Sequence, residues 1–458
     1  MKSKLLLPLI LLSHLILLLN LRFTAWPEMT LWPYLLDRGL TAYRDIVIVY
    51  PPVSIMLLAF LGKLFGQSLF SLQIYTWFLV LSTDILVYLI GKKVIGKNST
   101  AQIALLFYIP WQLFFDGNGL WFDLLLAPLS LLVFYFLWEK KYFWTGIFFG
   151  LSLLIKQTAF WFLIPIFFTF WINKNFKLKP LLNFSLGIVV LVILSLLYLI
   201  KLGILPEFYQ WAINFGLFYL PRQPGQVLLP TFKNIGAMSV PYGFLLIGIW
   251  FLLKRKLKEK NLLLVLMVWS IFGFMGAFSR WEYFHFQPSL PFLAILSGIV
   301  ITNFKISMKK DLLPLLVLVF IVTGTIYLQV RFYSLNWQKP TRFFESDILE
   351  TASWIKSNTT PGEKIYILNS WDHLYALSGT LPAVSPLIHT LPWHLEYPGM
   401  QEKYVSDLAT NKPKMIVFQP YSQTGLGSYR PAKIDKFIQE NYNLSDIVAG
   451  RFWILKLK

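Results

Sequence analysis

The sequence contains no cysteine, which excludes disulfide bonds, thiolate metal sites and cysteine nucleophiles. Charged residues are also scarce, since they make up 14% of the 458 residues whereas 56% are hydrophobic. A soluble core cannot bury that much apolar surface, so lipid must be the solvent. The mean hydropathy of +0.60 agrees with this reading. Composition therefore predicts an integral membrane protein.

Acidic residues are few, because 22 Asp and Glu stand against 41 Lys and Arg and give a formal net charge of +19. A nucleic-acid binder gathers its basic residues along one groove. Here they form short runs between apolar segments. The charge therefore reports membrane topology, and no nucleic-acid partner is expected.

Apolar segments recur over most of the chain. They lie at 4–21, 68–90, 101–115, 121–138, 142–156, 158–172, 180–200, 236–253, 261–278, 286–303 and 311–330. The first follows Lys2 and Lys4 without a clear small-residue cleavage site, so we interpret it as a helix and not as a signal peptide. The pattern predicts an all-α polytopic membrane domain over residues 1–335, with about eleven transmembrane helices.

The basic runs indicate the orientation of these helices. They begin at Gly91, Glu139, Asn173, Lys254 and Lys305. Positive residues in short loops stay on the cytoplasmic side. All the runs, together with the basic N-terminus, fall on that side only if residues 51–65 do not cross, which fits a juxtamembrane helix on the outer surface. We therefore expect a plasma-membrane protein with a cytoplasmic N-terminus and an extracytoplasmic C-terminus.

The composition changes from Asn336 onward. Hydrophobic runs shorten to KIYIL at Lys364 and MIVFQ at Met415, and helix-like stretches cover 346–358 and 432–441. Residues 336–458 thus predict a small extracytoplasmic α/β domain.

The first outer loop, YLLDRGLTAYRDIVIVYPP from Tyr34, is the most informative stretch. It carries Asp37 and then Tyr43, Arg44 and Asp45 ahead of the Pro-Pro pair. Asp45 is held at the membrane surface between rigid elements, where partial desolvation suits a general base. The alternative is that Asp45 pairs with Arg44 or Arg38 and only pins the loop.

Further candidates fall at the same end of the predicted helices. Asp116 and Asp123 in FFDGNGLWFD are seven residues apart and would share a face if the segment were helical. They suit a sugar, an acceptor or a cation, and the alternative is helix capping and loop solvation.

Lys156, followed by Gln157, lies at an apolar outer turn. A cation in that setting needs a partner, for which a phosphate is the natural choice, or it snorkels to the interface. The segment from Ser279 brings Arg280, Glu282 and His285 together. Arg and His suit an anionic head group, with Glu282 orienting either one. Arg222, in the aromatic loop 201–230, is a weaker anion candidate.

These motifs together resemble the GT-C membrane glycosyltransferases. The likeness rests on the first-loop Y-R-D and Y-P-P, on the G-x-x-x-x-x-K-Q turn at 150–157 and on R-x-E-Y-x-H at 280–285. Among these enzymes, the motif pattern is most similar to that of the protein O-mannosyltransferases, aminoarabinose transferases and rhizobial galacturonosyltransferases.

The resemblance implies a hexosyl- or pentosyltransferase, of inverting type, that moves a sugar from a polyprenyl-phosphate carrier to a lipid, glycan or protein acceptor outside the cytoplasm. It implies that Asp45 acts at the acceptor, and that Lys156, Arg280 and His285 hold the carrier phosphate. Asp37 matches the family's acid pair only loosely. No cofactor is certain, and the need for a divalent cation stays open because relatives differ.

Two other classes remain. A lipid or lipid-linked-sugar flippase also needs many helices, but transporters usually carry polar residues near the midplane and show repeated halves. The third reading is an inactive relative with a binding role.

Overall fold

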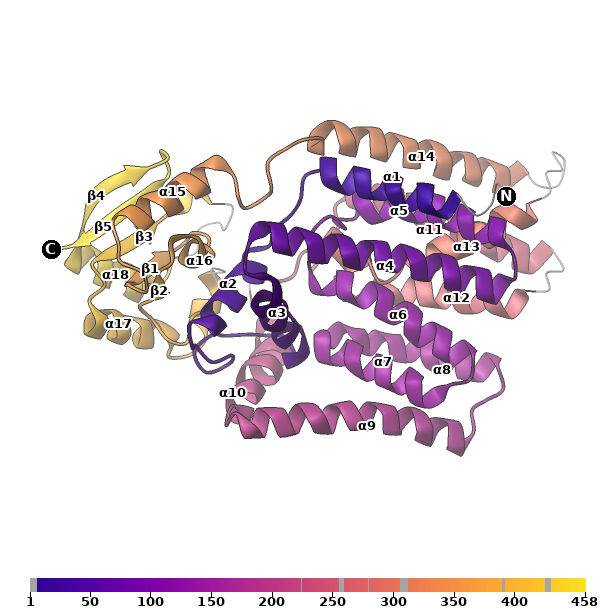
Figure 1. The fold of residues 1–458 in the computed structure, drawn as a ribbon, viewed down its shortest axis with the longest axis horizontal. Helices are drawn as coiled ribbons and strands as arrows, with labels where there is room; N and C mark the ends of the chain where they lie inside the picture. The colour runs from indigo at the N-terminus through magenta and orange to yellow at the C-terminus, as the bar shows by residue number, and fades with distance from the viewer. Residues whose placement is uncertain are drawn as a thin grey trace.

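The computed structural model describes residues 6–223, 225–254, 259–278, 280–304, 312–388, 392–424 and 430–458. Each of the eleven predicted apolar segments coincides with a helix (Figure 1). These helices are α1 Leu6–Asn20, α4 Leu69–Ile95, α5 Asn98–Phe114, α6 Phe122–Trp138, α7 Tyr142–Ile155, α8 Leu163–Ile172, α9 Leu178–Lys201, α11 Phe232–Lys254, α12 Lys260–Gly273, α13 Leu290–Asn303 and α14 Leu312–Asn336.

Length separates these helices into two groups. Among the described residues, five helical stretches are long and apolar enough to cross a membrane by themselves, and they comprise α4, α9, α11, α14 and α12 extended to Phe278. Several of the others, including α6, α7 and α13, have 14 to 17 residues. The mostly helical fold class predicted from hydropathy is confirmed.

Burial explains the arrangement of the bundle. α13 is apolar on every side, and Leu290 to Val300 are all buried, as expected for a helix at the centre of a bundle. α9 lies at the edge of the bundle, and most of its apolar side chains are exposed. Such an apolar surface is typical of a helix that faces lipid.

Two glycines allow α7 and α9 to pack closely. A Cβ atom on Gly146 would lie 2.0 Å from the carbonyl oxygen of Phe184, and one on Gly187 would lie 2.3 Å from that of Phe143. Only glycine permits this approach, as at other small-residue helix contacts in membranes. The contact fixes the position of α7, whose C-terminal end leads into the site.

Successive helices alternate in direction. The described N-terminal end of α1 lies at the end of the bundle farthest from the C-terminal sheet (Figure 1). The short connections after α4, α6 and α8 lie at that end too, and they carry the basic runs that begin at Gly91, Glu139 and Asn173. The runs from Lys254 and Lys305 fall largely outside the described residues.

Juxtamembrane elements fill the space between the bundle and the sheet (Figure 1). They are α2 Pro27–Asp37, α3 Pro52–Phe65, α10 Leu205–Phe208, the π-helical η2 Tyr209–Tyr219 and the short η3 Leu220–Arg222. α3 is a separate 14-residue helix, as predicted. The expectation of a loop over 201–230 is wrong in its centre, because residues 209–219 form a π-helix.

The C-terminal part contains a five-stranded sheet of order β2-β1-β3-β5-β4. Its strands are β1 Lys364–Leu368, β2 Leu381–Pro382, β3 Met415–Phe418, β4 Tyr442–Val448 and β5 Phe452–Leu457. β1 pairs in parallel with β2 and β3, whereas β5 is antiparallel to β3 and β4. The helices are α15 Ser346–Ser357, α16 Leu374–Ser378, α17 Met400–Asn411 and α18 Ala432–Asn441.

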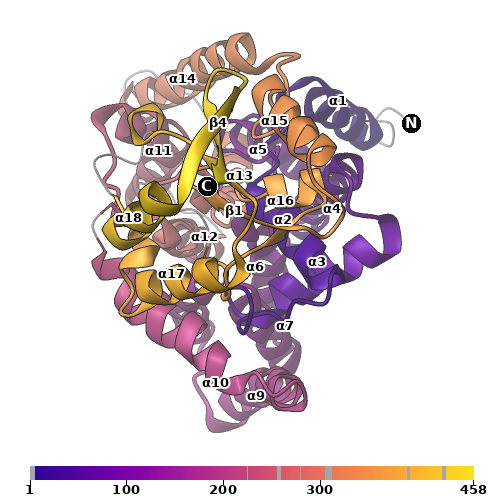
Figure 2. The same cartoon turned by 90° about the vertical axis from the view of Figure 1, so that its left-hand side faces the viewer.

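This sheet unit covers one end of the bundle and contacts the first loop (Figure 2). The hydroxyl of Tyr34 donates to the carbonyl oxygen of Thr380 at 3.0 Å. Ile46 and Leu387 form a short parallel bridge, in which the amide of Val47 donates to the carbonyl of Leu387 at 2.8 Å. The division into domains at residue 336 stays a prediction.

Candidate active site

Three side chains that are far apart in the sequence meet at the sheet-facing end of the bundle. Asp123 lies in the first turn of α6, Lys156 follows the last residue of α7, and His285 lies in the 3-10 turn η5, Tyr283–Phe286. The ammonium of Lys156 pairs with Oδ2 of Asp123 and lies 3.1 Å from Nδ1 of His285. All three residues are buried. We call them the Lys–Asp–His cluster.

Two contacts of opposite kind meet at Nδ1 of His285. Burial, and next the adjacent Lys156 ammonium, lower the pKa of His285 below its ordinary value, so the ring is neutral at pH 7. Nδ1 lies 3.1 Å from the Lys156 ammonium, which only donates hydrogen bonds, and 3.1 Å from Oδ2 of Asp123, which only accepts them. These two contacts together hold the ring of His285 against the Lys156–Asp123 pair.

The structure gives Lys156 a protein partner that the sequence did not indicate. The sequence predicted that Lys156 has a partner, most naturally a phosphate, with snorkelling to the outer interface as the alternative. Its side chain is instead buried and paired with Asp123. A phosphate would have to join this pair as a second anion, with the imidazole of His285 beside it.

Aromatic rings border the cluster and form what we call the aromatic wall. Its members are Trp26, Tyr50, Trp121, Phe122 and Phe284. The Lys156 ammonium lies 6.0 Å from the ring centre of Phe284. The rings of Phe284 and Trp121 are 5.3 Å apart, as are those of Phe284 and Trp26. The wall keeps water from the buried charges and strengthens their interactions.

Gln157 connects the cluster to the first loop. Its side-chain amide donates to the carbonyl of Val49 at 2.5 Å and to that of Ala212, in η2, at 3.3 Å. The residue after Lys156 thus ties the end of α7 to two juxtamembrane segments. Gln157 acts here by positioning.

Glu28 is a carboxylate that the sequence analysis missed. It lies in the first turn of α2 and is 9% exposed. Burial, followed by the charges of Glu28 and Asp123, raises the pKa of Tyr50 above its ordinary value. The negative charges of Glu28 and Asp123 therefore both raise the pKa of the same residue of the aromatic wall, Tyr50. The order Pro27-Glu28 was the available signal, because it places an acid at a helix start directly after the first span.

Asp45 lies at the contact between the first loop and the sheet unit. One carboxylate oxygen accepts from the amide of Thr41 at 2.7 Å, and the hydroxyl of Ser385 lies 3.5 Å from the other. Its carbonyl accepts from the amide of Leu387 at 2.8 Å. These contacts hold the loop in place, and the catalytic role of Asp45 stays a prediction.

The neighbours of Asp45 have separate contacts. Tyr43 is buried, and its hydroxyl donates to the carbonyl of Tyr50 at 2.8 Å. Arg44 is exposed and lies 3.3 Å from Glu207, so it does not form the pair with Asp45 considered above. Asp37 and Arg222 are both exposed. Their substrate roles stay predictions.

A second charged group lies near the aromatic wall. Arg280 and Glu282 are paired at 3.4 Å, and Arg280 also donates to the carbonyl of Gly225 at 3.2 Å. The Arg342 guanidinium lies 5.3 Å from the ring centre of Trp26. Burial raises the pKa of Asp116 to about 6, although Arg342 opposes the rise. The sequence analysis did not select Arg342, because this residue lies just after the last predicted transmembrane helix, in a stretch that resembles a linker.

The structure separates Asp116 from Asp123. α5 ends at Phe114 and α6 begins at Phe122, so no helix joins the two acids and they do not share a face. Asp123 belongs to the Lys–Asp–His cluster, whereas Asp116 has a positive φ of 56° in the intervening turn. Asp and Asn tolerate that backbone conformation better than most residues.

Asp116 leads to a prediction about stability and pH. Its folded pKa of about 6 lies above its ordinary value of 3.8, so the charged carboxylate destabilises the fold above pH 6, and this cost is lost as pH falls from 6 to below 3.8. Asp116→Asn removes the charge. We expect its apparent Tm to exceed the wild-type value by about 2 °C at pH 8.

The gap should shrink to about half at pH 5 and nearly close by about pH 4, as measured by thermal unfolding in one detergent at each pH. Asp37→Asn, which removes an exposed carboxylate at the end of α2, is the control, and its Tm difference from the wild type should show no such pH dependence. An Asp116→Asn gap of equal size at pH 5 and pH 8 would contradict the assignment.

A buried polar network supports the site from within the bundle. Nδ1 of His14 lies 2.7 Å from Asp84, and its Nε2 lies 3.2 Å from the side-chain oxygen of Gln112. Gln112 also donates to the carbonyl of Gly117 at 2.9 Å. Gln287, two residues after His285, donates to the carbonyls of Gln112 and Phe115. The network therefore connects α1, α4 and α5 to the turn that carries His285.

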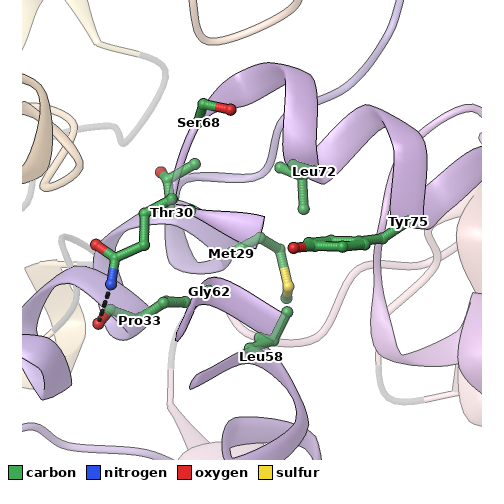
Figure 3. A pocket seen from close by; sticks show the side chains of 10 residues that line it. Met29, Thr30, Pro33, Leu58, Gly62, Ser68, Leu72 and Tyr75 are labelled. Atoms are coloured by element: carbon green, nitrogen blue, oxygen red, sulfur yellow. Dashed lines mark hydrogen bonds between the residues drawn. The ribbon is translucent and has the colours of Figure 1, made fainter. Parts of the chain in front are cut away.

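A metal site receives no support from the ligand geometry. Across the residues that the structure describes, no three His, Asp or Glu side chains gather as metal ligands. A small pocket between α2, α3 and α4 is lined by Met29, Leu58, Leu72 and Tyr75, among others (Figure 3). Its cavity volume of about 20 Å³ has room for a water molecule but not for a sugar or a lipid.

Comparison with known proteins identifies the fold. Residues 49–199 match the model of the family described as dolichyl-phosphate-mannose-protein mannosyltransferase. This match covers less than half of the chain but includes α3 to α8 and most of α9, with Lys156 and Asp123. Among curated protein sequences, none is similar enough to this chain to count as a relative.

Solved structures share the fold over the whole chain. ArnT from Cupriavidus metallidurans bound to undecaprenyl phosphate superposes with a TM-score of 0.65 at 12% identity, covering 99% of this chain and 97% of that one. The apo form of ArnT gives 0.65 at 13% identity, with the same coverage. The Archaeoglobus fulgidus oligosaccharyltransferase tethered with an acceptor peptide gives 0.61 at 12% identity, covering 97% and 72%.

These likenesses establish the architecture. The chain has the GT-C fold of membrane glycosyltransferases, with a helical membrane part and a small C-terminal sheet. The fold predicted from the motif resemblance is confirmed.

Proposed function

We propose that the chain is an integral membrane glycosyltransferase that moves a sugar from a polyprenyl-phosphate carrier to an acceptor. The buried Lys–Asp–His cluster, at the loop end of a GT-C fold, is the observation that carries this proposal. The ArnT structure of the same fold is bound to undecaprenyl phosphate. A lipid-linked phosphate is therefore the donor group that best suits Lys156 and His285.

The reaction is a single displacement. An acceptor hydroxyl attacks the anomeric carbon, the bond from that carbon to the phosphate oxygen breaks, and the polyprenyl phosphate leaves with the electron pair. Lys156 and His285 stabilise the charge that develops on the phosphate. A carboxylate takes the hydroxyl proton, and the configuration at the anomeric carbon inverts.

Two first-loop carboxylates are candidates for the base. Asp45 is the residue indicated by the motif resemblance. Glu28 is supported by burial and by the shared influence of Glu28 and Asp123 on Tyr50. Because the contacts of Asp45 are with the loop and with Ser385, we propose Glu28 as the base and Asp45 as a residue that anchors the loop.

The decisive experiment is a transfer assay. Purified protein is incubated with radiolabelled undecaprenyl-phosphate sugars and a lipid extract, and label should move covalently to a new product. The flippase alternative instead predicts that the labelled lipid crosses a liposome membrane without changing chemically. The fold and the position of the charges at one end of the helices favour transfer.

We further propose that the site and the sheet unit lie outside the cytoplasm, because the basic runs lie at the opposite end of the bundle. The sequence contains no cysteine, so single cysteines report without background. Ser357 and Ser99 are both exposed; Ser357 is the last residue of α15, in the C-terminal part, and Ser99 lies in the first turn of α5, just after the basic run from Gly91. We expect an impermeant thiol reagent to label Ser357→Cys in intact cells and Ser99→Cys only after permeabilisation. The reverse pattern would overturn the orientation.

A further inference from the structure

The aromatic wall contains two buried hydrogen-bond donors that have no protein partner. The rings of Trp26 and Trp121 lie 5.2 Å apart and are tilted by 54° to each other. In the described part of the chain, neither indole Nε1 meets an acceptor, although both atoms are buried. Trp121 as a whole is 7% exposed. Buried donors are paired in nearly all native structures, so two adjacent unpaired indoles require an explanation.

An unpaired indole alone does not define a site in this protein. Nε1 of Trp269 is also buried without a partner. Its ring packs against Phe134, Phe162 and Phe292 inside the bundle, where nothing polar can reach it. Trp269 therefore has a packing role and provides a matched comparison.

Trp121 differs from Trp269 in its neighbours. The ring centres of Trp121 and Phe284 are 5.3 Å apart. The Lys156 ammonium lies 6.0 Å from the ring centre of the same Phe284. Trp121 is also two residues before Asp123 of the Lys–Asp–His cluster. Tyr50, which completes the wall at 6.1 Å from Trp121, is only partly buried. The unpaired donors thus adjoin the proposed phosphate position.

Donor chemistry places the sugar beside that position. In a polyprenyl-phosphate sugar the anomeric carbon is bonded directly to a phosphate oxygen, so the sugar ring must lie next to the cations that hold the phosphate. One face of a pyranose presents C–H bonds, which suit an aromatic ring, and its hydroxyl oxygens accept hydrogen bonds. Rings with a polar N–H edge provide both kinds of contact.

We infer that the aromatic wall is the donor-sugar subsite, in which Trp26 and Trp121 stack against the pyranose and donate their indole N–H groups to its hydroxyls. This inference rests on the proposed function. It assigns recognition of the carrier phosphate to the Lys–Asp–His cluster and recognition of the sugar to the wall.

The test compares carriers with and without a sugar. Purified full-length protein is titrated with undecaprenyl phosphate and with the mannose, glucose and 4-amino-4-deoxyarabinose forms of that lipid. In the wild type, we expect at least one sugar-bearing probe to bind more tightly than the bare carrier. Trp121→Phe keeps an aromatic ring but loses the N–H. It should lower the affinity for that probe about tenfold, the effect of one lost hydrogen bond to a buried group.

The bare carrier should bind Trp121→Phe within twofold of the wild type, which shows that the variant is folded. Trp26→Phe should behave in the same way. Trp269→Phe is the control, because it removes an equally buried and unpaired N–H, and it should change neither affinity.

The remaining outcomes separate the two levels of the argument. If the wild type fails to bind undecaprenyl phosphate, the proposed function fails and this inference falls with it. If the bare carrier binds but no sugar-bearing probe binds more tightly, the subsite inference alone is overturned. The same holds if Trp121→Phe leaves the advantage of the sugar-bearing probe unchanged.

Discussion

Lys156→Gln should lower the affinity for undecaprenyl phosphate by about 10²–10³, the effect of removing one member of a buried charge pair. The ammonium is the charged group of the Lys–Asp–His cluster that can bind the phosphate. Without it, the phosphate would face Asp123 directly. Isothermal titration or competition with a labelled polyprenyl phosphate provides the measurement.

The single variant also leaves Asp123 buried without its cation, so lost binding alone could reflect poor folding. The double variant Lys156→Gln with Asp123→Asn removes both charges and keeps similar side-chain volumes. It should recover the wild-type Tm while binding stays lost. Lys201→Gln, an exposed lysine at the same end of the bundle, is the control. Normal carrier binding by the double variant would refute the phosphate role.

Glu28→Gln should slow single-turnover sugar transfer by about 10²–10⁴, the usual cost of losing a general base. Carrier binding should stay within a fewfold of the wild type, because Glu28 is not assigned to the phosphate. Gln keeps the size of the side chain and most of its hydrogen bonds. The donor is the one that the labelled-lipid assay identifies.

Asp45→Asn and Asp37→Asn complete this comparison. Asp45→Asn should cost less than tenfold in the transfer step, since its contacts with Thr41 and Ser385 hold the loop. Asp37, on the same helix as Glu28 but exposed, should have no effect. Near-normal transfer by Glu28→Gln together with collapse of Asp45→Asn would return the catalytic assignment to Asp45, as the motif resemblance indicated.

The sequence predicted the elements whose signal is local. Apolar runs located the eleven helices, since a membrane-spanning helix needs a long hydrophobic stretch. β1 and α18 fall where KIYIL and residues 432–441 placed them. The π-helix at 209–219 was missed, because π-helical hydrogen bonding has no simple sequence signature.

The sequence predicted at which end of the bundle the site lies, but not which of its side chains are in contact. Alternating topology placed Asp123, Lys156 and His285 at one end, but their pairing depends on how α6, α7 and η5 are rotated about their axes. The same limit applies to His14 and Asp84, each of which looks isolated in its own helix. Glu28 and Arg342 were missed because each lies beside a span boundary, where charged residues are common.

The helices that carry the site are shorter than a bilayer is thick. α7 and α13 have 14 residues each, which at 1.5 Å per residue spans roughly 21 Å. The hydrocarbon layer is about 30 Å thick. Such a mismatch is relieved by local thinning of the membrane. The reacting phosphate would then lie in a depression of the lipid surface, where a carrier reaches the cations without leaving its leaflet and a water-soluble acceptor group descends to meet it.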